Sequence, residues 1–289
     1  MLRAMYSGIS GLKNFQSKLD VVGNNIANVN TFGYKKGRVT FKDLVSQQVG
    51  SASGGNGATA GGINPKEVGL GGTMATVDNV YNQGAMQNTG RALDVGISGE
   101  GFFVTIVNGQ AQYTRAGNFY TDNNGDLVTG EGTYLLGTGA KPAANLPAPN
   151  LTGNIPDVVA GSTAYGKISI PTDARSLSIG KDGQVSYVDA AGALQTAGYI
   201  VTANFSNNAG LSKVGANNFL QSQNSGDPLI GAAGDLGRGN LVSGALEMSN
   251  VDLSEEFTEM IVAQRGFQAN TRIITTSDEI LQELVNLKR

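Results

Sequence analysis

Residues 2–29 read LRAMYSGISGLKNFQSKLDVVGNNIANV. Apolar side chains recur every seven residues in this stretch, at Met5, Leu12, Leu19 and Ile26. Seven-residue spacing keeps one side of a helix facing a partner helix, which is the coiled-coil pattern. Asn and Gly tolerate the left-handed backbone that ends helices, so we expect this helix to end between Asn30 and Gly33.

The other end of the sequence repeats this pattern. Its heptad series is Leu253, Met260, Phe267, Ile274 and Leu281. Asp252 followed three residues later by Glu255 is typical of the capping box that begins a helix. A helix of about 35 residues would extend about 50 Å, which is too long for an element of a compact core. We therefore expect the two terminal helices to pair as a coiled-coil-like rod.

Charge also differs between the two ends. Residues 1–45 hold seven basic and two acidic side chains, whereas residues 251–289 hold four basic and seven acidic ones. Exposed ion pairs contribute little, so two solvated helix faces would explain these charges equally well. The apolar heptad series favour contact between the helices.

The composition changes twice between the helices. Residues 50–72 contain nine glycines and few apolar side chains, so they cannot build a core. From residue 73 to about residue 243, short apolar or alternating runs are separated by turn residues, which predicts strands. We expect these strands at 102–107, 110–114, 167–170, 176–179, 184–188 and 199–205. Asn108-Gly109 and Asp182-Gly183 predict tight hairpins, because both dipeptides accept positive φ angles.

Together these patterns predict an α+β fold. We expect an N-terminal helix over residues 1–33 and an extended, glycine-rich linker over 34–72. An all-β domain would follow over residues 73–243, and a C-terminal helix over 244–289 would complete the helical rod.

The composition excludes several kinds of chemistry. The 289 residues include no His, Cys or Trp, which removes the imidazole base, the thiolate nucleophile, the usual zinc ligands and disulfides. A formal net charge of −3 argues against nucleic acid and membrane surfaces as partners. No apolar run reaches the roughly 18 residues of a membrane span, and no cleaved signal peptide is recognisable. We expect no enzyme activity, no catalytic residue, no cofactor and no metal.

Three candidate sites have simpler explanations. Residues 161–167 resemble a phosphate-binding loop, but Ile168 stands where a hydroxyl should hold magnesium. Asp122, Asn124 and Asp126 match the first positions of a calcium loop, but its required Gly and Glu are absent, which favours a turn. Acidic residues of the β region show no spacing that singles out a glycosidase pair. An enzyme acting on polysaccharide and a secreted binding module remain alternatives.

Several longer motifs resemble one known family. Residues 24–35 read NNIANVNTFGYK after SGISGL at 7–12, and residues 259–270 read EMIVAQRGFQAN. Between them lie GEGFF at 99–103, YTRAGNF at 113–119 and GDLVT at 125–129. All of these resemble bacterial flagellar rod and hook proteins, in the same order and over nearly the whole chain. The resemblance implies a structural subunit whose terminal helices line the channel of a hollow homopolymer with β domains on its outer wall.

Within the family, KNF at 13–15 and VTFKDL at 39–44 most resemble a short hook protein with one β domain. Such a subunit would couple rod to filament as a flexible, torque-transmitting tube. The alternative is a distal rod protein, since NPKEVGLG at 64–71 and LEMSNV at 246–251 occur in both types.

The resemblance also implies partners and a location. The partners would be further copies, the distal rod, the hook–filament junction proteins, the hook cap and the flagellar type III export apparatus. The location would be extracellular, in the flagellum. The residues expected to serve self-assembly are Leu12, Leu19, Asn24, Asn25, Ile26, Asn28, Thr31, Gly33, Met260, Gln264, Arg265, Phe267, Asn270, Ile274 and Leu281.

Overall fold

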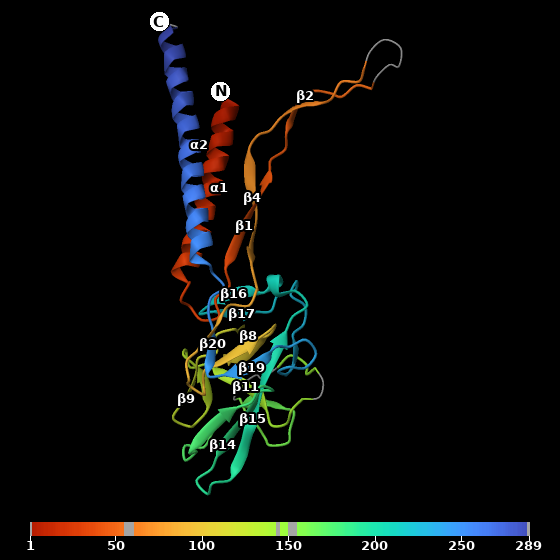
Figure 1. The fold of residues 1–289 in the computed structure, drawn as a ribbon. Helices are drawn as coiled ribbons and strands as arrows, with labels where there is room; N and C mark the ends of the chain where they lie inside the picture. Colours follow the sequence, from red (N-terminus) through yellow and green to blue (C-terminus); the bar gives the residue numbers. More distant parts are fainter. Residues whose placement is uncertain (1, 55–60, 143–144, 150–154, 288–289) are drawn as a thin grey trace. The chain divides into compact units, whose positions relative to one another are not determined.

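The fold has a long helix near each end of the chain and strands between them (Figure 1). The structure is a computed structural model that describes residues 2–54, 61–142, 145–149 and 155–287. This arrangement confirms the α+β class expected from the sequence.

The helices and strands run in the following order. They are α1 (Leu2–Ala27), β1 (Gly37–Asp43), β2 (Gln47–Gly50), β3 (Lys66–Val68), β4 (Gly72–Asn79), β5 (Met86–Asn88), β6 (Val95–Ser98), β7 (Phe102–Val107), β8 (Gln110–Thr114), β9 (Phe119–Thr121), β10 (Leu127–Thr129), β11 (Tyr134–Thr138), β12 (Tyr165–Lys167), β13 (Ser176–Ile179), β14 (Gln184–Val188), β15 (Leu194–Asn204), the 3-10 turn η1 (Asn208–Gly210), β16 (Ser212–Gly215), β17 (Asn218–Leu220), β18 (Leu229–Ala232), β19 (Asn240–Ser243), β20 (Ala245–Glu247) and α2 (Leu253–Leu287).

The chain divides into two compact units. The helical unit comprises Met1–Ala27, Gly37–Asn79 and Asp252–Arg289, and the β unit comprises Asn28–Lys36 and Val80–Val251. This division differs from the parts expected above. Residues 37–43 and 72–79, placed in the linker and at the start of the β domain, form the antiparallel pair β1–β4. That pair packs against α1, so it belongs to the helical unit.

The helices α1 and α2 of the helical unit are antiparallel. Lys18 Nζ lies 3.2 Å from Glu259 Oε2, and Asn25 near the end of α1 hydrogen-bonds Glu256 near the start of α2. The cap of α2 follows the sequence pattern, because Asp252 Oδ1 accepts a hydrogen bond from Ser254 N at 2.8 Å. On its other side α1 contacts the ribbon of β1 and β4, which continues into the shorter pair β2–β3. The glycines at 55 and 57 of the expected linker lie outside the described residues.

Glycines set how closely the two helices approach. A Cβ added to Gly266 would lie 2.4 Å from Phe15 Cζ, and one added to Gly11 would lie 2.8 Å from Asn270 Oδ1. A Cβ on Gly8 would meet Ile274 Cγ1 at 3.4 Å. Side chains of each helix therefore fill gaps beside glycines of the other, which fixes the helix register.

The β unit is built on a large sheet whose strands differ in length, with an apolar core on each face. Its central path is β13-β14-β15-β11-β7-β8-β17-β16, and all of these neighbours are antiparallel. In β7, Phe103 enters one core, whereas Phe102, Val104 and Ile106 enter the other. A core on both faces explains why this strand is an apolar run with little alternation.

Both expected hairpins are confirmed. Asn108 and Gly109 have φ angles of 50° and 80° between β7 and β8, and Gly183 has a φ of 89° between β13 and β14. These angles suit turns that match the twist of the paired strands.

Four expected boundaries were wrong. The C-terminal helix expected from residue 244 begins at Leu253, because residues 245–247 form β20. The strand expected at 167–170 is β12 at Tyr165–Lys167, because Ile168 O and Ile170 N bond the turn around Gly125 to Leu127 instead. The strand expected from residue 199 begins at Leu194, since β14 pairs with it across a bulge. The first helix ends at Ala27, and residues 28–33 form turns.

Candidate functional site

Helix α2 carries many large apolar side chains that stay exposed beside its contact with α1. Met260, Ile274 and Leu281 of its heptad series are half-buried, and Ala263 and Ser277 are buried, whereas Leu253 and Phe267 of the same series are exposed. The large exposed apolar side chains of the helix are Leu253, Phe257, Ile261, Val262, Phe267, Ile273, Ile280, Leu284, Val285 and Leu287. Exposed apolar side chains in such number are a mark of an interaction surface.

The residues expected to serve assembly fall into three groups. Leu12, Leu19, Ile26, Met260, Asn270, Ile274 and Leu281 are half-buried within the helical unit. Gln264, Arg265 and Phe267 are exposed on α2, and Arg265 Nη1 donates to Gln268 Oε1 at 3.3 Å. The remaining five, Asn24, Asn25, Asn28, Thr31 and Gly33, lie at the end of α1 and just after it. Gln264 and Arg265 are therefore open to solvent, whereas Asn270 is half-buried.

Asn25 joins three elements of the helical unit. Its Oδ1 accepts from Gly37 N and its Nδ2 donates to Gly37 O, both at 2.9 Å. The same Nδ2 lies 3.1 Å from Glu256 Oε2. Only 1% of Asn25 is exposed, so this amide fastens the start of β1 to both helices. Asn24, its neighbour, is exposed on α1.

The turn that follows α1 is held by its own polar groups in the β unit. Thr31 Oγ1 donates to Asn28 Oδ1 at 3.2 Å, and Thr31 N donates to Asn28 O at 3.1 Å. Gly33 has a φ of 69°, and an added Cβ would lie 2.6 Å from the carbonyl carbon of Arg115. No other residue type fits there without displacing the backbone.

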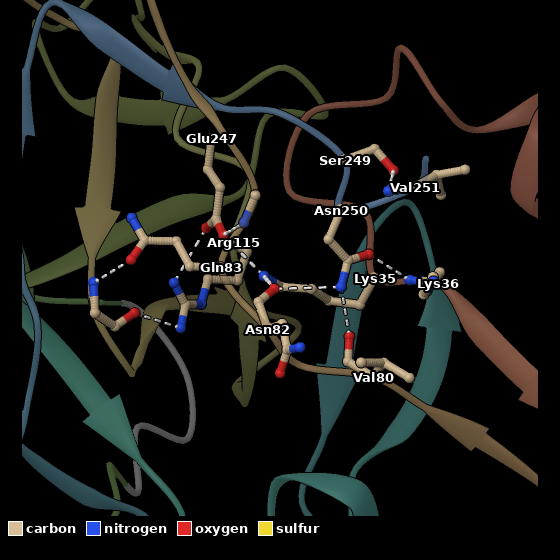
Figure 2. A network of polar contacts seen from close by, with 12 residues as sticks. Lys35, Lys36, Val80, Asn82, Gln83, Arg115, Glu247, Ser249, Asn250 and Val251 are labelled. Atoms are coloured by element: carbon tan, nitrogen blue, oxygen red, sulfur yellow. Dashed lines mark hydrogen bonds and ion pairs between the residues drawn. The ribbon is translucent and has the colours of Figure 1, made fainter. Parts of the chain in front are cut away.

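A cluster of buried charges lies in the β unit (Figure 2). Glu247, at the end of β20, accepts hydrogen bonds through both carboxylate oxygens. Lys35 Nζ and Gly84 N lie 2.8 and 2.9 Å from Oε1, and Arg115 Nη1 lies 3.1 Å from Oε2. The side chains of Lys35 and Glu247 are fully buried. We call Lys35, Arg115 and Glu247 the charge clamp.

The clamp also bonds the surrounding backbone. Lys35 Nζ donates to Asn82 O at 2.8 Å, and Arg115 Nη2 donates to Gly99 O at 2.9 Å. The backbone oxygen of Glu247 accepts from Gly33 N at 2.8 Å. Charged groups without water need such partners, because their desolvation is otherwise unfavourable.

Burial governs the electrostatics of the clamp. It lowers the pKa of the Lys35 ammonium, and the nearby Glu247 carboxylate opposes this shift. Burial likewise lowers the pKa of the Arg115 guanidinium, again against the effect of Glu247. Two cations share one carboxylate, so Glu247 is the member on which both others depend.

Asn250 ties the same segments with neutral hydrogen bonds (Figure 2). Its Oδ1 accepts from Lys36 N at 2.8 Å, and its Nδ2 donates to Val80 O at 2.8 Å and Asn82 O at 3.2 Å. Val80 N in turn donates to Lys36 O at 2.9 Å. The segments 33–36, 80–84 and 247–250 are thereby fixed to one another. Each adjoins a position where the chain passes from one unit to the other.

The sequence did not reveal this cluster. Lys35, Arg115 and Glu247 stand in motifs quoted above, but nothing in their spacing shows that they meet. Only the fold brings Lys35 into contact with Glu247, across a sequence separation of 212 residues.

The residues considered above for a phosphate-binding loop, a calcium loop and a glycosidase pair lie in turns or at the surface. Asp122 Oδ1 accepts from Asn124 N and Asp126 N at 2.8 and 2.9 Å, as expected for a turn. Residues 161–164 lead into strand β12, which ends at Lys167, and Lys167 is paired with Asp126. Three hollows of the β unit contain one carboxylate each, from Glu131, Asp227 and Asp122 respectively.

Two further properties concern the described part of the chain. None of the helices there combines the length and the apolar character that crossing a membrane would require. Over the same residues, no group of three or more His, Cys, Asp or Glu side chains gathers in a way that could hold a metal ion.

These features define a class of protein: a structural subunit with paired terminal helices, exposed apolar side chains on α2 and a β unit between the helices in the sequence. Comparisons with known proteins identify the family. Residues 5–35 match the family described as "Flagella basal body rod protein", residues 96–187 the "Flagellar hook protein FlgE/F/G D1 domain" and residues 242–287 the "Flagellar basal body rod FlgEFG protein C-terminal".

Individual relatives agree with these matches. The chain is 55% identical to the flagellar basal-body rod protein FlgG of Bacillus subtilis over 290 aligned positions, with all of both chains covered. It is 36% identical to FlgG of Borreliella burgdorferi and 32% identical to that organism's hook protein FlgE, again with full coverage. The chain therefore belongs to the family of flagellar rod and hook proteins, which are structural components of the flagellum.

Proposed function

We propose that this protein is the distal rod subunit of a bacterial flagellum. The full-length identity of 55% to a rod protein is the observation that carries the proposal. The hook relative is 32% identical, and its alignment runs over 442 positions against 289 residues here, so it contains long insertions that this chain lacks. The comparisons thus favour the distal rod alternative over the hook subunit that the sequence led us to expect.

The exposed apolar side chains of α2 support polymerisation. Phe257, Ile261 and Val285 are 49%, 58% and 66% exposed although they are large and apolar. Burying them against neighbouring copies would remove apolar surface from water, at roughly 25 cal/mol per Å². A head-to-tail contact that repeats without closing builds a helical tube. The terminal helices would line its channel.

The residues of the α1 end and of α2 have complementary roles in this proposal. Exposed Gln264, Arg265 and Phe267 would contact other copies directly. The half-buried heptad residues would act through the helix pair, because they hold α2 in the position that presents its exposed apolar side chains. Asn25, Asn28, Thr31 and Gly33 would fix the chain where α1 ends.

The charge clamp and Asn250 suit a subunit under mechanical load. Because three chain segments are tied together by buried groups, a force on one segment is shared with the others and with the core of the β unit. Torque would then pass through a subunit without peeling one strand away at a time.

Location and partners complete the proposal. Further copies and neighbouring proteins of the flagellar axis would be its partners, and the hook–filament junction and cap proteins would apply only to a hook subunit. The chain would leave the cell through the flagellar type III export apparatus without a cleaved signal peptide.

Assembly of the full chain tests the polymer. The native protein should form tubes visible by electron microscopy and pellet on centrifugation, and Ile261→Gln should weaken this assembly severalfold without lowering the thermal midpoint of the subunit. Glu279→Gln, an exposed polar change on the same helix, is the matched control. Native chains that stay monomeric even when seeded with purified flagellar axes would contradict polymerisation.

The subtype needs a separate measurement. Antibody against the protein should label the envelope-spanning rod in electron micrographs of isolated flagella. Labelling of the external hook would refute the distal rod assignment.

A further inference from the structure

The turn between β18 and β19 contains a leucine in an unfavourable backbone conformation. Leu236 has a φ of 51°, Gly237 has a φ of 82°, and Arg238 N donates to Asp235 O at 3.1 Å. A hydrogen-bonded turn with two positive φ angles at its centre is of type I′, which favours Gly, Asn or Asp at the first central position. Leucine is disfavoured there, because its Cβ crowds the following carbonyl oxygen.

Within the described residues, neither apolar core of the β unit includes Leu236 to compensate for this conformation. Leu236 is 67% exposed and belongs to neither apolar core of the β unit. The described non-glycine residues with positive φ are Asn108, Ala216, Asn217 and Leu236. Asn tolerates the conformation and Ala is small, so Leu236 alone in this set combines backbone strain with an exposed large apolar side chain.

The turn is held firmly at its base. Arg238 is 4% exposed, and its Nε donates to Ala232 O at 2.9 Å while Nη1 donates to Asn145 Oδ1 at 2.7 Å. Gly234 N donates to Gly239 O at 3.1 Å, and Gly239 N donates to Glu100 O at 2.6 Å. The strained leucine is therefore presented on a fixed support.

We propose that Leu236 is an anchor residue that a second copy of this chain buries on assembly. Strain that persists at an exposed position commonly marks a functional site, and burial of the side chain by a neighbour supplies the missing compensation. The inference rests on the proposed polymer, because the polymer provides the second copy.

The size of the contact favours another copy over an unrelated protein. One leucine offers far less area than the roughly 1,200 Å² that a stable independent interface buries. Copies already joined through their helices need much less, since a further contact between them forms at high effective concentration. The same contact would repeat at every subunit of the tube.

Replacing a residue with this role should stabilise the unassembled chain and weaken its assembly. In the full-length unassembled chain, Leu236→Gly and Leu236→Asn should raise the melting midpoint of the β unit by about 2–4 °C, because both residues relieve the strain. In the assembly assay, both should raise the critical concentration about tenfold, because the buried leucine is lost.

Ala216→Gly is the matched control. Ala216 is also exposed with a positive φ of 51°, at the β16–β17 turn, but it offers little apolar area. This change should raise the melting midpoint and leave the critical concentration as it is in the native chain.

Two results would overturn the inference. One is a Leu236→Gly chain that assembles at the native critical concentration while the native chain polymerises normally, and this leaves the polymer proposal intact. The other is a lowered melting midpoint in both variants, which would make Leu236 a residue that supports the fold. If the native chain itself never polymerises, the polymer proposal and this inference fail together.

Discussion

The close approach of the two helices at Gly266 gives the sharpest stability prediction. An ideal Cβ at this position would lie 2.4, 2.6 and 2.8 Å from three ring carbons of Phe15. Ordinary contacts between carbon atoms lie at about 3.5–4.0 Å, so Gly266→Ala overlaps the ring by about 1 Å. Either the ring leaves its rotamer or the helices separate, and such overpacking typically costs about 1–3 kcal/mol.

The same substitution also raises helix propensity, which stabilises the chain, so this gain must be separated from the packing cost. Replacing Gly by Ala inside a helix contributes about 1 kcal/mol of stabilisation. Gly23→Ala in α1 provides the reference, because a Cβ there meets no atom within 4 Å. Both variants gain the same propensity, so the difference between their stabilities isolates the packing term. Gly266→Ala should be less stable than Gly23→Ala by about 1–3 kcal/mol.

Denaturant unfolding followed by circular dichroism at a helical wavelength measures this difference, since that signal reports on α1 and α2. Gly23→Ala should be more stable than the native chain by up to about 1 kcal/mol. If Gly266→Ala proves as stable as Gly23→Ala, the helices are not held in register by the fit of Phe15 against Gly266.

The remaining predictions concern the β unit. Glu247→Gln should destabilise it by about 3–5 kcal/mol in denaturant unfolding, because two buried cations lose their carboxylate. Lys35→Met, which leaves Arg115 paired with Glu247, should cost less, and an equal or larger loss would show that the clamp does not depend chiefly on Glu247. Burial raises the pKa of Tyr113 from its usual value of 10 to about 12. Between these two pKa values the folded state keeps a proton that the unfolded state releases. The contribution of Tyr113 to the free energy of unfolding is therefore complete below pH 10, and roughly 2–3 kcal/mol of it is lost as the pH rises toward about 12. Melting midpoints from pH 9 to 12 should fall less steeply for Tyr113→Phe than for the native chain, and parallel curves would count against this assignment.

Local patterns in the sequence were sufficient for much of the fold. The heptad series predicted both terminal helices, because the side of a helix that packs is set by residue spacing alone. Asp252 predicted the start of α2, and Asn108-Gly109 predicted the hairpin of β7 and β8. Boundaries were less predictable, since Ile168 and Ile170 have apolar strand-like spacing but bond a turn that is distant in sequence.

The candidate site was much harder to predict from the sequence than the helices and hairpins, because its contacts form only in the fold. A charged residue such as Glu247 is expected at the surface, and its burial becomes acceptable only when Lys35 and Arg115 reach it from distant segments. The partner of Gly266 is likewise defined by a helix more than 200 residues earlier in the chain.

The sequence by itself determined the helices, the tight hairpins, the α+β class and the family, because these follow from residue spacing, local backbone preferences and motifs. The tertiary structure decided which glycines face side chains, which apolar residues of α2 stay exposed, and that Leu236 is both strained and unburied. These properties depend on pairing between segments far apart in the chain, and the local free energies that shape a helix or a turn contain no term for such pairing.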